Sequence, residues 1–122
     1  MSEPFELTPY CPQFRRAIEL IGRRWTGAII RALLTGATRF SDLSTAVPGL
    51  SDRLLSERLK ELEAAAIVER VVVPSMPVRV EYYLTAKGRG LLHVIEVISA
   101  WAHQWGETPE QRPVADDRRR AG

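Results

Sequence analysis

The sequence predicts a mainly α-helical protein with one small β-hairpin. Apolar residues recur at three- and four-residue spacing along most of the chain, which is typical of helices that bury one face. The pattern changes at Ile67, where the β-branched run IVERVVV is followed by PSMP and then by alternating apolar and polar residues. The length of 122 residues indicates one domain.

Three helices are expected in the first part of the chain. Pro12 suits the first position of a helix, and Gly22 closes that helix. A second helix begins at about Trp25, and Gly36 provides its C-terminal stop. Thr38 is then expected to cap a short third helix.

A fourth, longer helix is expected from about Ser51 to Ala66, after the break at Val47-Pro48-Gly49. Its two faces differ in a helical projection. Leu54, Leu55, Leu59, Leu62 and Ala66 gather on one side, and Arg53, Ser56, Glu57, Lys60 and Ala64 gather on the other. The first side is predicted to join the core, and the second is available for recognition.

Arg58 falls among the leucines of this helix. We therefore expect a largely buried guanidinium held by a carboxylate, with Asp42 as the leading candidate, because an unpaired charge there would be strongly destabilising. The role of Arg58 is predicted to be structural.

The segment from about Ile67 to Leu84 is predicted to be the hairpin, with PSMP at its tip. A helix, a turn, a longer helix and a two-stranded wing make up a winged helix-turn-helix. In this arrangement the second helix enters the major groove of DNA, and a wing arginine can reach the minor groove or phosphates.

A last helix is expected from about Ala86 to Trp105, with Thr85 as its cap. It is apolar over a wider arc than one small core requires, which suggests a partner helix, most simply the same helix of a second subunit. Residues 1–106 are thus predicted to form one DNA-binding and dimerisation domain, and residues 107–122 a flexible polar tail.

The charge of the chain does not by itself indicate nucleic acid. The formal net charge is +2, and residues 39–83 contain six basic and seven acidic residues. Binding to phosphates must therefore depend on where the cations lie. No apolar run approaches the roughly 20 residues that span a bilayer, and the start lacks the pattern of a secretory signal. We expect no membrane association and a cytoplasmic location.

Several ordered motifs between about residues 11 and 105 carry a family resemblance. They are Cys-Pro at Cys11, Gly-x-x-Trp from Gly22 to Trp25, Arg39-Phe40, Pro-Gly-x-Ser from Pro48 to Ser51, Arg-Leu-x-x-Leu-Glu from Arg58 to Glu63, and Val-Glu-Tyr-x-Leu-Thr from Val80 to Thr85. The chain resembles the HxlR family of bacterial winged helix-turn-helix regulators. That resemblance implies a homodimer, built from the first and last helices, that binds double-stranded operator DNA and changes transcription. The family commonly has Gly-Lys where this chain has Arg23 and Arg24.

The candidate DNA contacts fall into two groups. Arg39 matches the family arginine expected at a phosphate, Ser51 lies where a helix N-terminus can offer amides to another phosphate, and Arg79 is the wing candidate. Sequence discrimination is expected from the outward residues Asp52, Arg53, Ser56, Glu57 and Lys60. Arg53 is the strongest candidate because arginine can donate two hydrogen bonds to guanine. Alternatively, Arg53 contacts only phosphate and Arg79 is merely solvated.

Cys11 is the only cysteine, which excludes an intrachain disulfide and a cysteine-cluster metal site. It lies at a helix start with Arg15 one turn on, and both features favour thiol reactivity. In some members of the resembling family the matching cysteine senses electrophiles or oxidants. The alternative is a small residue that packs at the dimer interface.

The remaining motifs do not indicate catalysis. His93 and His103 have no ligand partners at metal spacing, and no phosphate loop or catalytic constellation is recognisable, so neither an enzyme nor a cofactor is expected. Trp25, Trp101 and Trp105 are expected in core or dimer packing, or around a small-molecule effector between subunits. A winged-helix module that binds another protein remains the alternative function.

Overall fold

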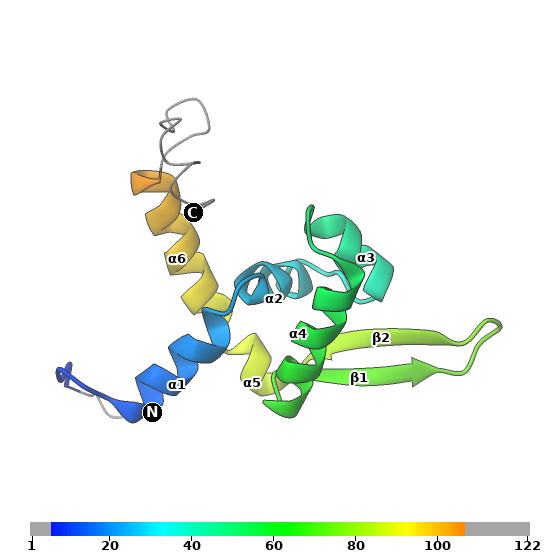
Figure 1. Ribbon diagram of the computed structural model, residues 1–122, viewed down its shortest axis with the longest axis horizontal. Helices are drawn as coiled ribbons and strands as arrows, with labels where there is room; N and C mark the ends of the chain where they lie inside the picture. Colours follow the sequence, from blue (N-terminus) through cyan, green and yellow to red (C-terminus); the bar gives the residue numbers. More distant parts are fainter. Residues whose placement is uncertain (1–5, 107–122) are drawn as a thin grey trace. The chain divides into compact units, whose positions relative to one another are not determined.

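The computed structural model describes residues 6–106, and this part of the chain is mainly helical with one antiparallel hairpin (Figure 1). The elements are α1 (Pro12–Ile21), α2 (Thr26–Leu34), α3 (Phe40–Ala46), α4 (Asp52–Ala64), β1 (Val68–Val73), β2 (Arg79–Leu84), α5 (Ala86–Arg89) and α6 (Leu92–Trp105). The predicted order of three helices, a longer helix and a wing is confirmed. The predicted tail lies outside the described residues. The chain divides into two units, Met1–Leu92 and His93–Gly122.

The core of the first unit is formed by one face each of α2, α3 and α4 together with the start of β1. Its largest fully buried apolar side chains are Ile29, Ile30, Leu43, Leu55, Leu59 and Leu62. Full burial of such a side chain contributes about 1.5–3 kcal/mol. The three leucines of α4 are spaced by four and three residues and belong to the predicted stripe, of which Leu54 is half-buried.

Side-chain caps fix the starts of α3 and α4. The Ser51 hydroxyl accepts a hydrogen bond from the Leu54 N–H at 3.1 Å, as the sequence predicts. The expectation that Thr38 caps α3 is wrong, because Arg39 occupies the cap position and its N–H donates to Asp42 Oδ2 at 3.4 Å. The carboxylate of Asp42 thus serves the start of its own helix.

α4 ends earlier than predicted. Its last helical residue is Ala64, and Ala66 adopts a left-handed backbone with φ of 61°. The expectation that Ala66 extends the apolar face is therefore wrong. A left-handed residue after a helix end reverses the chain direction and is usually glycine. Here it directs the chain into β1.

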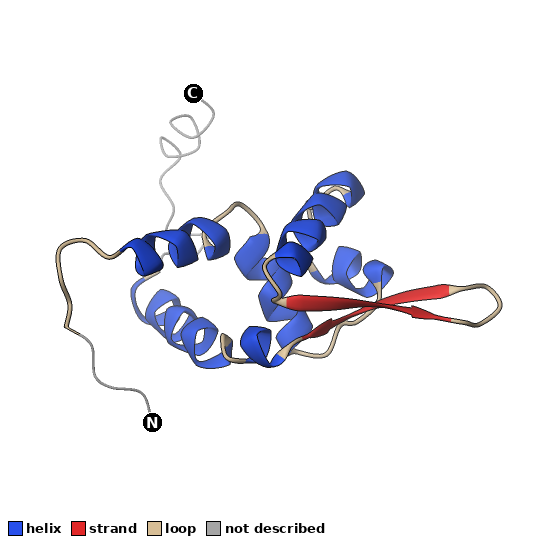
Figure 2. Ribbon diagram, turned by 90° about the horizontal axis from the view of Figure 1, so that it is seen from below, coloured by secondary structure: helices blue, strands red, loops and turns tan. Residues whose placement is uncertain are grey.

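The hairpin pairs Val68 with Leu84 at its base and Val73 with Arg79 near its tip. Its two strands twist about each other (Figure 2) and extend away from α2, α3 and α4 (Figure 1). The Tyr82 N–H donates to the Thr38 carbonyl oxygen at 2.7 Å, which fastens the hairpin to the segment before α3. The base of the wing is thereby fixed relative to the helix-turn-helix.

The single last helix predicted from Ala86 to Trp105 is instead two helices. α5 has only four residues, and its cap is the predicted one, since Thr85 Oγ1 accepts from the Gly88 N–H at 3.0 Å. A Cβ on Gly88 would lie 2.2 Å from the carbonyl oxygen of Ile67, so the first turn packs closely on the end of α4 and the start of the hairpin. Gly88 and Gly90 both weaken helix continuity, and α6 begins only at Leu92.

Candidate nucleic-acid interface

The outward face of α4 presents three of the predicted recognition residues to solvent. Arg53, Glu57 and Lys60 are exposed, and 90% of the Arg53 side chain is accessible. Arg53 Nε lies 3.4 Å from Glu57 Oε2, an exposed pair one helical turn apart. Such pairs contribute little stability, so Arg53 can exchange Glu57 for another acceptor at small cost. This face can therefore donate hydrogen bonds to a ligand that reaches α4.

Two other predicted contact residues, Ser51 and Asp52, are hydrogen-bonded within the protein, and a third, Ser56, is only partly accessible. The Ser51 hydroxyl is occupied as the cap of α4. Asp52 Oδ1 accepts a hydrogen bond from the Ser44 hydroxyl at 3.1 Å, which joins α3 to α4 across the turn. Ser56 is half-buried. What remains available from this group is the N-terminal backbone of α4, whose partial positive charge suits an anion.

Glu81 of β2 lies at the centre of a polar cluster on the wing. It accepts from Arg79 Nε at 3.0 Å and from the Tyr83 hydroxyl, while its own side chain is 12% exposed. Arg39 pairs with Glu81 through a backbone bridge. The hydrogen bond from Tyr83, followed by that from Arg79, lowers the pKa of Glu81, and the bond to Glu81 raises the pKa of Tyr83.

This role of Glu81 is not predicted by the sequence motifs. The available signal was the alternation of β2, because residues two apart in a strand share a face, which places Arg79, Glu81 and Tyr83 together. The predicted wing arginine is thus paired with Glu81 and 40% exposed. Arg39, in contrast, is exposed at the start of α3.

Arg58 is buried, as predicted, but the predicted carboxylate partner is wrong. Its Nη1 lies 3.1 Å from Glu61 Oε2, and its Nε donates to the Arg24 carbonyl oxygen at 3.0 Å. Glu61 follows one turn later on α4, whereas Asp42 is engaged at the start of α3. Arg58 therefore holds α4 to the turn before α2 and does not face outward.

Cys11 lies at the N-cap of α1, where its sulfur accepts a hydrogen bond from the Phe14 N–H at 3.5 Å. The thiol itself donates to Gln13 Oε1 at 3.3 Å. Arg15 turns toward Glu19, with Nε 3.1 Å from Oε2. Of the two activating influences expected from the sequence, the helix N-terminus is in place, and the arginine is engaged elsewhere.

A small cavity of about 200 Å³ lies beside Cys11. It is lined by Glu6, Leu7, Thr8, Pro9 and Phe14 as well as by the cysteine. Cys11 itself is half-buried.

Two helices, α1 and α6, leave large apolar side chains exposed. Neither α1 nor the described part of the second unit contains a buried residue. Phe14 of α1 and Trp101 and Trp105 of α6 are each about two-thirds exposed. Large exposed apolar side chains of this kind are typical of surfaces that bind a partner.

No three metal-ligating side chains come together in residues 6–106, and none of the described helices is long and apolar enough to cross a membrane. His93 and His103 stay apart from any such cluster.

Comparison with known proteins identifies the family of the chain. The sequence pattern of the HxlR-like helix-turn-helix family matches residues 20–110. The chain belongs to this family. The HTH-type transcriptional regulator YvaP of Bacillus subtilis is 48% identical over 95 residues, which cover 78% of this chain and 88% of YvaP. The regulator YodB of the same organism is 46% identical over 97 residues, 80% of this chain and 87% of YodB.

Solved structures of YodB resemble this HxlR-like chain closely. The reduced form of YodB superposes with a TM-score of 0.71 at 46% identity, covering 80% of this chain and 96% of YodB. YodB has also been solved after diamide treatment and with a quinone bound. The predicted winged-helix architecture and family are thus confirmed, and the chain is a helix-turn-helix transcriptional regulator.

Proposed function

We propose that this HxlR-like regulator binds double-stranded, palindromic operator DNA as a homodimer in the cytoplasm, and that modification of Cys11 alters the binding. The observation that carries the proposal is the exposed face of α4 beside a hairpin, in a chain whose α1 and α6 bury none of their residues. The first feature fits a major groove, and the second fits a partner subunit.

The DNA contacts divide by chemistry. Arg53, Glu57 and Lys60 meet base edges or the adjacent backbone, because they are exposed on the outward face of α4. Arg39 and the N-terminal amides of α4 contact phosphates. Arg79 reaches DNA only by sharing or leaving Glu81, so its contribution is smaller than that of an unpaired wing arginine.

The dimer forms through the apolar faces of α1 and α6. Trp101 and Trp105 supply the large exposed aromatic surface that oligomer interfaces use. A two-fold axis then presents two copies of α4 to half-sites about 34 to 36 Å apart along the duplex.

Chemical modification of the Cys11 thiol changes DNA binding in this proposal. The sulfur of Cys11 adds to an electron-poor ring carbon of a quinone, and the ring is reduced to the hydroquinone as it takes up the thiol proton. With diamide the reagent takes up two hydrogens from two thiols, which form one disulfide. Since each chain has one cysteine, that disulfide joins two subunits or joins Cys11 to a small thiol.

The test is binding of the full chain to DNA upstream of its own gene, followed by fluorescence anisotropy at several salt concentrations. A regulator loses affinity steeply as salt rises, because phosphate contacts release counterions. Trp101→Glu should yield a monomer by analytical ultracentrifugation and weaken binding. Failure to bind that DNA, or any fragment in a genomic selection, would contradict the proposal and favour a protein-interaction module.

The switch is tested by adding a quinone or diamide to the same complex. The wild type should change its operator affinity, and Cys11→Ser should not. The introduced hydroxyl oxygen can still cap α1, so this variant preserves the local fold. Equal responses of the two proteins would contradict thiol control while leaving operator binding intact.

A further inference from the structure

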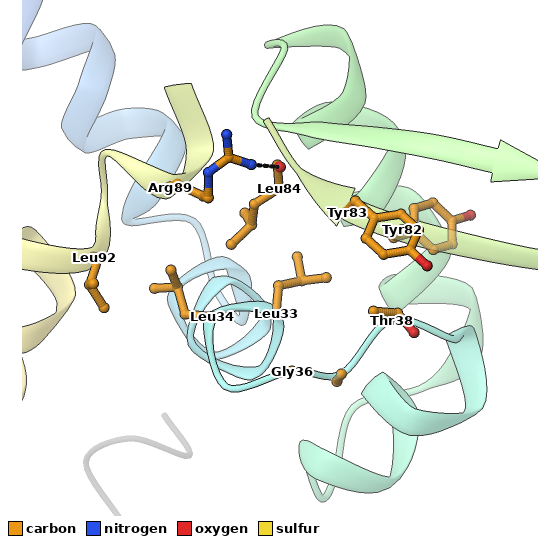
Figure 3. A pocket seen from close by; sticks show the side chains of 10 residues that line it. Leu33, Leu34, Gly36, Thr38, Tyr82, Tyr83, Leu84, Arg89 and Leu92 are labelled. Atoms are coloured by element: carbon orange, nitrogen blue, oxygen red, sulfur yellow. Dashed lines mark hydrogen bonds between the residues drawn. The ribbon is translucent and has the colours of Figure 1, made fainter. Parts of the chain in front are cut away.

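We propose that a second cavity, separate from Cys11, binds a small planar aromatic anion. It has a volume of about 440 Å³ and lies between α2, the segment before α3, the end of β2 and Arg89 of α5 (Figure 3). Ligand cavities typically span about 300–1,000 Å³. The inference rests on the proposed function only for its effect on DNA.

The walls of this cavity suit an aromatic ring. Figure 3 shows Leu33, Leu34 and Leu84 near one another, with Tyr82 and Tyr83 further along β2. Flat, rigid ligands bury much surface against such walls at little cost in conformational entropy. A two-ring aromatic molecule therefore matches the lining better than a flexible or strongly polar one.

The charge of the lining selects an anion. Among the described residues that line the cavity, Arg89 is the only charged one, and none carries a carboxylate. The guanidinium uses Nη1 to donate to the Leu84 carbonyl oxygen at 2.8 Å, which anchors it at the cavity edge. Its remaining N–H groups can donate to a ligand carboxylate, a charge-assisted bond about twice as strong as a neutral one.

Two wall residues connect this cavity to the DNA-binding surface. Tyr82 is bonded through its N–H to Thr38, directly before the exposed Arg39. The Tyr83 hydroxyl donates to Glu81, which also holds Arg79 of the wing. A ligand that contacts both tyrosines therefore acts on the joint between the wing and α3, and so on operator affinity.

The first probe is 2-naphthoate, with neutral 2-naphthol as the matched compound without a carboxylate. The chain contains three tyrosines, of which Tyr82 and Tyr83 line the cavity and Tyr10 lies next to Cys11 in the sequence. In protein labelled with 3-fluorotyrosine, 2-naphthoate should shift the ¹⁹F signals of Tyr82 and Tyr83 saturably and leave that of Tyr10 unchanged. A shift of Tyr10 alone, or no shift at millimolar 2-naphthoate, would overturn the proposal.

Three variants test the chemistry of the site. Arg89→Gln should weaken 2-naphthoate about tenfold and leave 2-naphthol unchanged, because it removes the charge and keeps an amide donor for Leu84. Ala37→Leu should weaken binding of both compounds by narrowing the cavity. Arg16→Gln removes a cation from a different cavity and should have no effect. Equal affinities in Arg89→Gln and wild type would overturn the anion assignment.

The effect on DNA is measured last, as operator affinity with and without saturating 2-naphthoate. A change in the wild type that is reduced in Ala37→Leu supports regulation through this cavity. An unchanged operator affinity with the site occupied overturns it. Absence of DNA binding without any ligand is a failure of the proposed function, and the ¹⁹F titration still decides whether the cavity binds.

Discussion

Arg58 of α4 donates from Nε to the main-chain carbonyl oxygen of Arg24 at a distance of 3.0 Å. This bond crosses from the recognition helix to the turn before α2, and a neutral side chain could not also pair with Glu61 as Arg58 does. The orientation of α4 thus depends on a buried side chain.

We expect Arg58→Ala to lower the free energy of unfolding by about 2–3 kcal/mol, because the change leaves a carbonyl oxygen without its donor and removes a buried hydrogen-bonded charge. Urea denaturation followed by circular dichroism measures the loss. The control is Arg23→Ala, since Arg23 Nε lies 3.3 Å from Glu61 but is half-exposed. That change should cost less than about 0.5 kcal/mol. Equal losses would contradict the structural role of Arg58.

Ala66→Gly should stabilise the protein by about 0.5–1 kcal/mol. Ala66 has φ of 61°, a left-handed conformation that costs a residue with a Cβ and costs glycine nothing. Ala65→Gly is the matched control, because Ala65 has φ of −85° and glycine there gains no relief. Thermal unfolding of the two variants distinguishes them: the midpoint should rise for Ala66→Gly only.

Arg53→Gln and Lys60→Gln should weaken DNA binding in different ways. Loss of Arg53 should reduce discrimination at one operator position by about 1–3 kcal/mol, since a bidentate arginine–guanine contact is lost. Loss of Lys60 should weaken all sequences alike and reduce the salt slope by about one. Selection from a randomised operator library, with salt titrations, measures both. A flat loss across sequences for Arg53→Gln would reassign Arg53 to phosphate.

Glu81 should make the stability of the protein depend on acid pH. Tyr83 and Arg79 lower its folded-state pKa below the ordinary 4.5, so its contribution is complete above about pH 4.5 and is lost as pH falls through the lowered value. The unfolding free-energy difference between wild type and Glu81→Gln should therefore shrink in that window. Tyr83→Phe removes the largest cause of the lowered Glu81 pKa, so the loss of stability should begin at higher pH. A difference independent of pH would show that Glu81 is not held in this way.

Much of the fold follows from local chemistry that the sequence displays. The leucine stripe of α4, its serine cap and the burial of Arg58 are properties of one helix, so spacing alone predicts them. The partner of Arg58 is not a property of one helix. Asp42 accepts instead from the Arg39 N–H at the start of α3, and Arg58 pairs with Glu61. The spacing of residues does not predict which carboxylate pairs with Arg58.

The same limit applies to the site. Exposure of Arg53 and Lys60 follows from their place on α4. The engagement of Asp52 with Ser44, and of Arg79 with Glu81, depends on how the turn and the strand bring side chains together. The sequence does not predict the break before α6 from apolar spacing, although Gly88 and Gly90 lie there and glycine weakens a helix through its backbone entropy.

α6 has 14 residues, none of them buried. An isolated helix of about 12–15 residues is only marginally stable in water, because nucleation is costly and few hydrogen bonds repay it. Its order must therefore come from whatever covers its apolar face. If that cover is a second chain, folding of this segment and association are a single equilibrium, and the melting temperature rises with protein concentration. At low copy number in a cell, the concentration of the regulator would then set the fraction of molecules in which α6 is folded.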